Sequence, residues 1–123
     1  MKVLALDYGR ARTGVAVSDP TGELARPLET VERAASEAGL DRLAAIVAEQ
    51  TADKVVVGLP LTLKGEHGEQ AQETERFVAV LRERLAVPVE VFDERFTSVL
   101  AGGDDARAAA HLLSDYLRWS KES

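Results

Sequence analysis

The chain has 123 residues, of which 46% are hydrophobic and 29% are charged, and its net charge is −6. This length suits a single domain with one core over residues 1–123, and the composition is ordinary for a globular protein. Such an acidic chain is not expected to coat nucleic acid by bulk electrostatics, although local arginines or metal ions can still oppose phosphates in an enzyme. Because the chain has no cysteine, disulfides, zinc–thiolate sites and thiolate nucleophiles are excluded.

The amino terminus has the pattern of a strand rather than of a secretory signal. No apolar run approaches the length that spans a membrane. We therefore expect a cytoplasmic protein without a membrane partner.

The first 19 residues organise the chain. Residues 3–6 form a continuous apolar run, as expected of a central strand covered on both faces, and residues 13–17 form a second strand-like run. Gly9 and Gly14 supply the turn between them, and Asp7 ends the first strand. A charge at the tip of a central strand needs compensation. Asp7 either pairs with Arg10 or Arg12, or caps the turn, or belongs to a metal or phosphate site.

The remaining elements follow in chain order. Residues 19–22 are of turn-forming types, and a strand over residues 25–31 would begin at Pro27 or lie on an edge of the sheet. Ser36 as N-cap and the apolar spacing that follows predict a helix over residues 36–50. Buried strands are predicted over residues 53–60 and 87–92, and helices over about residues 68–85 and from Asp104 or Asp105 onward.

This order of elements predicts an α/β fold. Strands connected through helices run parallel to one another, so the opening hairpin and the later strands form a mixed sheet with helices on both faces. In such sheets, chemistry collects at the carboxyl ends of the strands.

Acidic residues stand at three element ends. Asp7 ends the first strand, Glu94 follows the last strand, and Asp105 begins the last helix on its apolar face, since Ala109 and Leu112 follow at intervals of four and seven residues. Carboxylates gathered without a cation repel one another, and hard oxygen ligands suit Mg²⁺ or Mn²⁺. Two such ions about 3.5–4 Å apart would stabilise the attacking and leaving oxygens of phosphodiester hydrolysis.

Simpler interpretations exist for each of these acids. Glu94 next to Arg95 can be a surface ion pair, and Asp104 and Asp105 can be ordinary helix caps. His67 fits a solvated loop histidine as well as a general base or phosphate contact. Tyr116 and Trp119 fit packing better than base stacking. The basic side chains expected near the site are Arg10, Arg12, Lys64 and Arg95.

Four ordered motifs identify the chain as resembling a known family. Residues 4–19 (LALDYGRARTGVAVSD) closely resemble the opening signature of the YqgF/RuvX family of RNase H-like nucleases. Residues 57–61 with the QAQ stretch at 70–72, residues 93–98 (DERFTS), and residues 105–117 are similar to its later motifs in order and spacing. The resemblance covers essentially the whole chain.

The resemblance implies an RNase H-like sheet with strand order 3-2-1-4-5. It implies that Asp7, Glu94 and Asp105 are the catalytic and metal-binding residues. We also expect substrate contacts from Arg10, Arg12 and Arg95, and from Thr97 in the DERFTS motif. The cofactor it implies is Mg²⁺ or Mn²⁺.

The family implies two substrates, precursor 16S ribosomal RNA trimmed at its 5′ end or a Holliday junction. Related domains in larger transcription factors support a third interpretation, a non-catalytic nucleic-acid-binding module. The segment over residues 99–104 is shorter than usual in the family and contains two glycines, so it offers no obvious dimer helix. Because a junction resolvase needs two paired sites and many basic contacts, we expect an RNA substrate and a monomer or weak homodimer.

The actin-like sugar kinases and chaperone ATPases share the Asp-x-Gly strand turn. They place a nucleotide between two such domains, and 123 residues do not supply two.

Overall fold

The computed structural model describes residues 1–60, 68–93 and 105–122. Its elements in chain order are β1 (Val3–Asp7), β2 (Arg12–Ser18), β3 (Ala25–Glu32), α1 (Glu37–Gln50), β4 (Lys54–Leu59), α2 (Glu69–Arg84), β5 (Val89–Asp93) and α3 (Asp105–Glu122). Within these ranges, no helix combines the length and apolar character needed to cross a bilayer.

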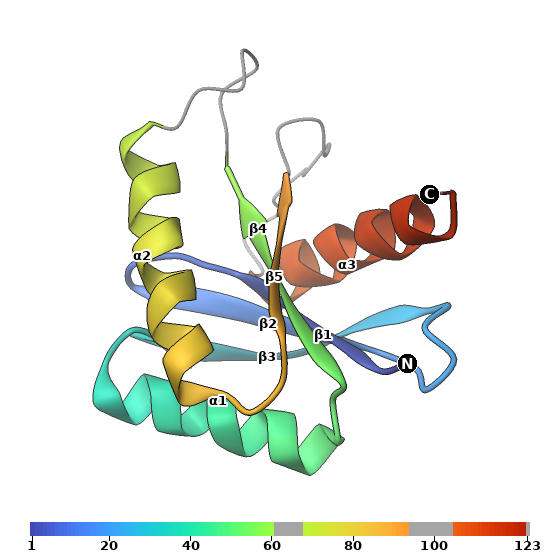
Figure 1. The fold of residues 1–123 in the computed structure, drawn as a ribbon, viewed down its shortest axis with the longest axis horizontal. Helices are drawn as coiled ribbons and strands as arrows, with labels where there is room; N and C mark the ends of the chain where they lie inside the picture. The colour runs from blue at the N-terminus through green and yellow to red at the C-terminus, as the bar shows by residue number, and fades with distance from the viewer. Residues whose placement is uncertain (61–67, 94–104, 123) are drawn as a thin grey trace.

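The five strands form one mixed sheet in the order β3-β2-β1-β4-β5, with β1 at its centre (Figure 1). β1 pairs antiparallel with β2 and parallel with β4, β2 pairs antiparallel with β3, and β4 pairs parallel with β5. The predicted strand order is therefore confirmed. The carboxyl ends of β1, β4 and β5 meet at one edge, because these three strands are parallel.

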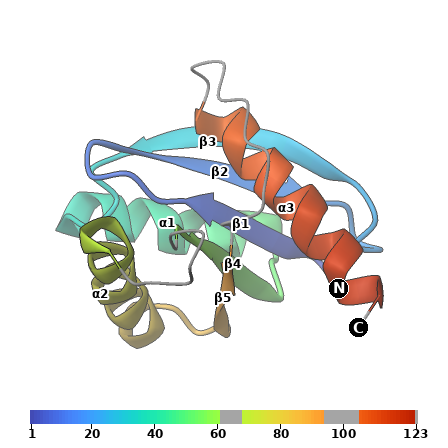
Figure 2. The ribbon, with the colours of Figure 1, turned by 90° about the horizontal axis from the view of Figure 1, so that it is seen from above.

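Helices cover both faces of the sheet, as predicted. α1 and α2 lie on one face and α3 crosses the other (Figure 2). Ser36 caps α1 by accepting a hydrogen bond from the Gly39 N–H at 3.1 Å, which confirms the predicted start of this helix. β3 lies on the sheet edge, as expected of a strand containing proline, although it begins at Ala25, two residues before Pro27.

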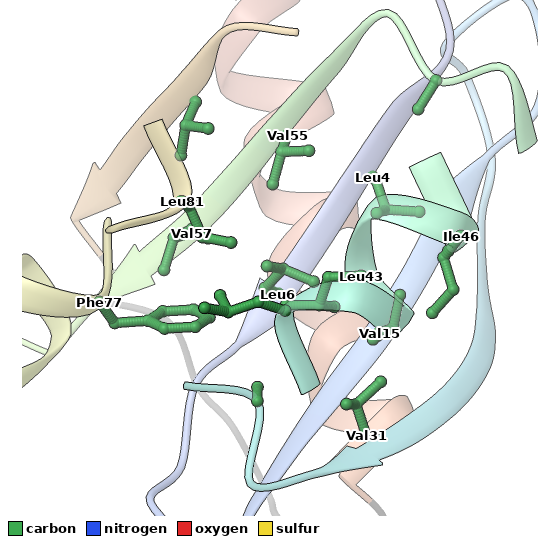
Figure 3. Packing of buried hydrophobic residues seen from close by; sticks show 14 of the residues in the cluster. Leu4, Leu6, Val15, Val31, Leu43, Ile46, Val55, Val57, Phe77 and Leu81 are labelled. Atoms are coloured by element: carbon green, nitrogen blue, oxygen red, sulfur yellow. The ribbon is translucent and has the colours of Figure 1, made fainter. Parts of the chain in front are cut away.

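The alternation of side chains in β1 separates two cores. Leu4 and Leu6 face α1 and α2, where they pack with side chains such as Leu43 and Phe77 (Figure 3). The second core, under α3, has smaller strand residues and is made of Val3, Ala5, Ala16, Val56, Ala109, Leu112, Leu113, Tyr116 and Leu117. Because successive residues of a strand point to opposite faces, Asp7 follows Val3 and Ala5 onto the α3 face.

Candidate active site

Asp7 is the last residue of β1 and lies at the carboxyl edge of the sheet. It stands opposite Gly14 in the antiparallel pairing of β1 with β2. Both residues are on the side of the sheet that α3 covers. The alternation of β1 and its register with β2 therefore direct the Asp7 carboxylate toward the start of α3.

Gly14 allows α3 to begin against the sheet. A Cβ atom at this position would lie 1.7 Å from the backbone oxygen of Asp105 and 2.9 Å from the Ala106 nitrogen. No residue with a side chain fits there without moving the helix. Since Gly14 is also the cross-strand partner of Asp7, this close approach places Asp105 beside Asp7.

The pKa of Asp7 reflects its burial and the nearby acid Asp105. Burial raises the pKa of the Asp7 carboxyl above its ordinary value, and the nearby Asp105 raises it further. Among the residues that the structure describes, none donates a hydrogen bond or ion pair to the Asp7 carboxylate. A partly buried carboxylate beside a second acid is the arrangement that a divalent cation relieves.

Neither arginine of the β1–β2 turn pairs with Asp7, so the ion-pair interpretation of Asp7 is wrong. Arg12 instead lies 3.4 Å from the Asp105 carboxylate, measured from Nε to Oδ2. Arg10 turns to α2, where Nε and Nη2 donate to the two Glu73 carboxylate oxygens at 2.8 and 3.3 Å. The two basic side chains thus turn to different helices, Arg12 to the start of α3 and Arg10 to α2.

Sequence reasoning missed the residues that hold this turn. Tyr8 stacks on Phe77 of α2, with ring centroids 4.3 Å apart and planes inclined by 22°. Glu73 holds Arg10 through two hydrogen bonds, and these raise the pKa of Arg10 while lowering that of Glu73. Gly9 is required because a Cβ there would meet the Arg12 carbonyl oxygen at 2.4 Å. A clue to the α2 contacts is the spacing of Glu73 and Phe77, which are four residues apart and therefore neighbours on the helix surface.

Several predicted site residues lie outside the described residues. These are Glu94, Arg95 and Thr97, together with Lys64, His67 and Asp104. Glu94 follows directly after Asp93, the last residue of β5, and β5 ends at the same sheet edge as β1. Within the described ranges, no group of three or more potential metal-ligating acids or histidines occurs.

A second polar cluster lies at the other end of α3. Lys54 donates to Glu90 at 2.8 Å and to the Tyr116 hydroxyl at 2.9 Å, and Tyr116 donates to Glu90 at 2.7 Å. The Tyr116 ring lies 5.5 Å from Phe92 and 5.8 Å from Trp119 between centroids. The packing interpretation of these aromatic residues agrees with this geometry, which fixes the far half of α3 on β4 and β5.

A mixed five-stranded sheet of this order, with helices on both faces, is an RNase H-like fold. The solved structure of T. thermophilus RuvC in complex with a Holliday junction substrate has the same fold, with a TM-score of 0.62 over 98% of this chain and 96% of that one. Its sequence identity to this chain is 16%.

The family described as "RuvX: Holliday junction resolvase" matches residues 1–104, and the chain belongs to this family. A protein of Chloroflexus aggregans named "Putative pre-16S rRNA nuclease" is 50% identical over 99 residues, covering 80% of this chain and 70% of its own. A protein of the same name from Chloroflexus aurantiacus is 46% identical, covering 94% of this chain and 85% of its own. Asp105 lies just beyond the family match, so its place in the site rests on the close approach to Gly14.

Proposed function

We propose that this protein is a divalent-metal-dependent nuclease that hydrolyses phosphodiester bonds in precursor ribosomal RNA. The observation that carries the proposal is the placement of Asp105 beside Asp7 at the carboxyl end of the central strand. The names of the relatives at 46% and 50% identity support nuclease activity and a ribosomal RNA substrate.

Asp7 and Asp105 supply the carboxylate oxygens of the proposed metal site, and Glu94 adds a third acid. Their oxygens are of the kind that Mg²⁺ and Mn²⁺ prefer, and the raised pKa of Asp7 indicates a carboxylate whose charge the protein alone does not compensate. When bound, such an ion activates water and stabilises charge on the phosphate oxygens. Asp7 lies between the strand core and the start of α3, so its orientation is fixed by both elements.

The basic residues of the β1–β2 turn contact the substrate in this proposal. Arg10 and Arg12 lie in the turn that follows Asp7, and their side chains are 81% and 65% exposed. A guanidinium group binds phosphate oxygens through parallel hydrogen bonds, so the two arginines can hold the phosphate backbone near the proposed metal site. Arg95 and Thr97 complete the proposed set of substrate contacts.

Holliday junction resolution is the second candidate, favoured by the description of the family. A resolvase makes two symmetric cuts and therefore needs a dimer that fixes two sites. We place RNA first because the net charge of −6 disfavours binding four DNA arms, and we propose a cytoplasmic monomer or weak homodimer.

A parallel cleavage assay tests the proposal. Purified protein with Mn²⁺ is incubated with a pre-16S 5′ leader RNA and, separately, with a mobile four-way DNA junction. We expect cleavage of the leader by the wild-type protein and none by Asp7→Asn. Symmetric nicking of the junction with no cleavage of the leader would instead indicate Holliday junction resolution. Binding of RNA without cleavage at saturating Mn²⁺ would indicate a non-catalytic nucleic-acid-binding module.

A further inference from the structure

α3 carries a row of basic and polar side chains on its solvent side. Figure 2 shows this helix crossing one face of the sheet, where no other helix of the described ranges lies. Five of its exposed positions recur at intervals of four and three residues, which places them along one line on the helix. The stripe consists of Arg107, His111, Ser114, Arg118 and Lys121, and all five are exposed.

The stripe stands out in a chain with a net charge of −6, because none of its five positions is acidic. Arg118 lies 3.7 Å from Asp115, and Lys121 lies 4.0 Å from Glu23, so both pairs are near the distance limit of an ion pair. The Arg118 and Lys121 side chains are 69% and 55% exposed, and pairs of this kind hold a cation weakly.

Cations on the opposite face are engaged differently. Arg42 of α1 donates to both carboxylate oxygens of Glu29 at 2.6 and 2.9 Å and also contacts Glu49. Arg84 of α2 contacts both Glu37 and Asp41. Each of these guanidinium groups is bound by two carboxylates. The pairs of Arg118 and Lys121 are weaker, so the positive charges of these two side chains remain accessible to a ligand.

The surface beside the stripe is hollowed along the helix. One hollow of about 250 Å³ lies between Pro27 of β3 and the α3 side chains of Arg107 and His111. A second of about 300 Å³ lies next to Arg118 and Lys121. The stripe begins two residues after Asp105, so it runs from the candidate active site toward the far end of α3.

We propose that this stripe binds the phosphate backbone of a double-helical RNA arm adjoining the cleavage site. From Arg107 to Lys121 the helix rises about 21 Å at about 1.5 Å per residue, which is long enough to pass several phosphates of one strand. Contacts of this kind fix position without reading sequence, and double-stranded RNA is recognised largely by shape and backbone. The inference rests on the proposed function, since it names the part of the RNA substrate that lies outside the cleavage site.

A binding measurement without divalent metal ions separates this inference from cleavage. Fluorescence anisotropy is recorded for a hairpin RNA with a single-stranded 5′ extension, for the extension alone, and for a DNA hairpin of the same sequence. The variant Arg107→Gln/Arg118→Gln removes two charges from the stripe. Its matched control, Arg26→Gln/Arg33→Gln, removes two exposed charges from outside the stripe, and thermal melts check that both variants fold.

We expect the stripe variant to bind the hairpin RNA about tenfold or more weakly at 0.1 M salt. Its slope of log K against log salt should fall by up to about 1.8, or about 0.9 for each phosphate that the protein no longer neutralises. Binding of the extension alone should be unchanged, and the control should match the wild type.

Three results would overturn the inference. In the first, the stripe variant and the control lose the same affinity for the hairpin RNA. In the second, the stripe variant loses as much affinity for the single-stranded extension as for the hairpin RNA. In the third, it loses as much affinity for the DNA hairpin. Each can occur whether or not the protein cleaves RNA, so failure of this inference is distinct from failure of the proposed function.

Discussion

Replacing Gly14 by alanine tests how the site is assembled. The added Cβ would lie 1.7 Å from the Asp105 carbonyl oxygen and 2.2 Å from its carbonyl carbon. Both are backbone atoms of the first helical residue, so no flexible side chain can move aside. To restore an ordinary contact of about 3.5 Å, the start of α3 must shift by close to 2 Å relative to β2.

Two opposing effects set the stability change. Alanine restricts the unfolded chain more than glycine does, which favours folding by about 0.4–1 kcal/mol. Overpacking in a close contact costs about 1–3 kcal/mol, and backbone atoms relax less easily than side chains. The clash therefore dominates, with a net loss of about 1–2 kcal/mol. At about 2.1 cal/mol/K per residue, this lowers the melting temperature by roughly 4–8 °C.

Activity should suffer more than stability, because the shift moves Asp105 away from Asp7. A misplacement of about 1 Å costs on the order of a hundredfold in rate when groups must be aligned. Thermal melts and leader-RNA cleavage rates for Gly14→Ala are compared with those for Gly68→Ala, where a Cβ meets nothing within 4 Å. Wild-type melting and cleavage by Gly14→Ala would refute the close approach as the device that positions Asp105.

Three further substitutions test other contacts of the site and the fold. Asp7→Asn should raise the melting temperature of the metal-free protein at pH 7.5, because burial and the nearby Asp105 make the charged carboxylate unfavourable. A lower melting temperature would contradict this. The hydrogen bond from Lys54 lowers the pKa of Glu90 in the folded protein. The ionised Glu90 therefore stabilises the fold at a pH above the ordinary pKa of glutamate, and this stabilisation is lost as the pH falls through the lowered pKa. Glu90→Gln should thus lower the free energy of unfolding by up to about 1 kcal/mol at pH 7 and leave it unchanged near pH 2. Chemical denaturation that gives the same difference between variant and wild type at both pH values would argue against this. Glu73→Gln should raise KM for leader RNA because it releases Arg10, while kcat and the melting temperature stay nearly unchanged. An unaltered KM in steady-state kinetics would show that Glu73 does not position Arg10 for the substrate.

Much of the fold followed from local patterns. The continuous apolar run of residues 3–6 predicted a central strand, and the helical spacing after Ser36 predicted α1 with its N-cap. These features depend on residues that are close together in the chain, so they can be recognised in a single sequence. The boundaries were less accurate, since the last strand begins at Val89 rather than at position 87.

The contacts that complete the site depend on residues far apart in the chain. Arg10 and Glu73 are separated by 63 positions, and only the packing of α2 against the β1–β2 turn brings them together. We expected Gly14 in the turn before the second strand, which was wrong: it lies within β2, where the lack of a side chain admits the backbone of Asp105. The partner of Arg12 could not be chosen from charge alone, because Asp7 and Asp105 are both acids at this end of the sheet.

Binding of Mn²⁺ to the protein tests the central claim, that Asp7 and Asp105 hold one divalent-metal site. Electron paramagnetic resonance of free Mn²⁺ reports the bound fraction during a titration, with no substrate or cleavage required. We predict saturable binding to the wild type, weakened by at least about tenfold in Asp7→Asn and in Asp105→Asn alike, because each variant removes a charged ligand. Wild-type affinity for Mn²⁺ in either variant would contradict the shared site.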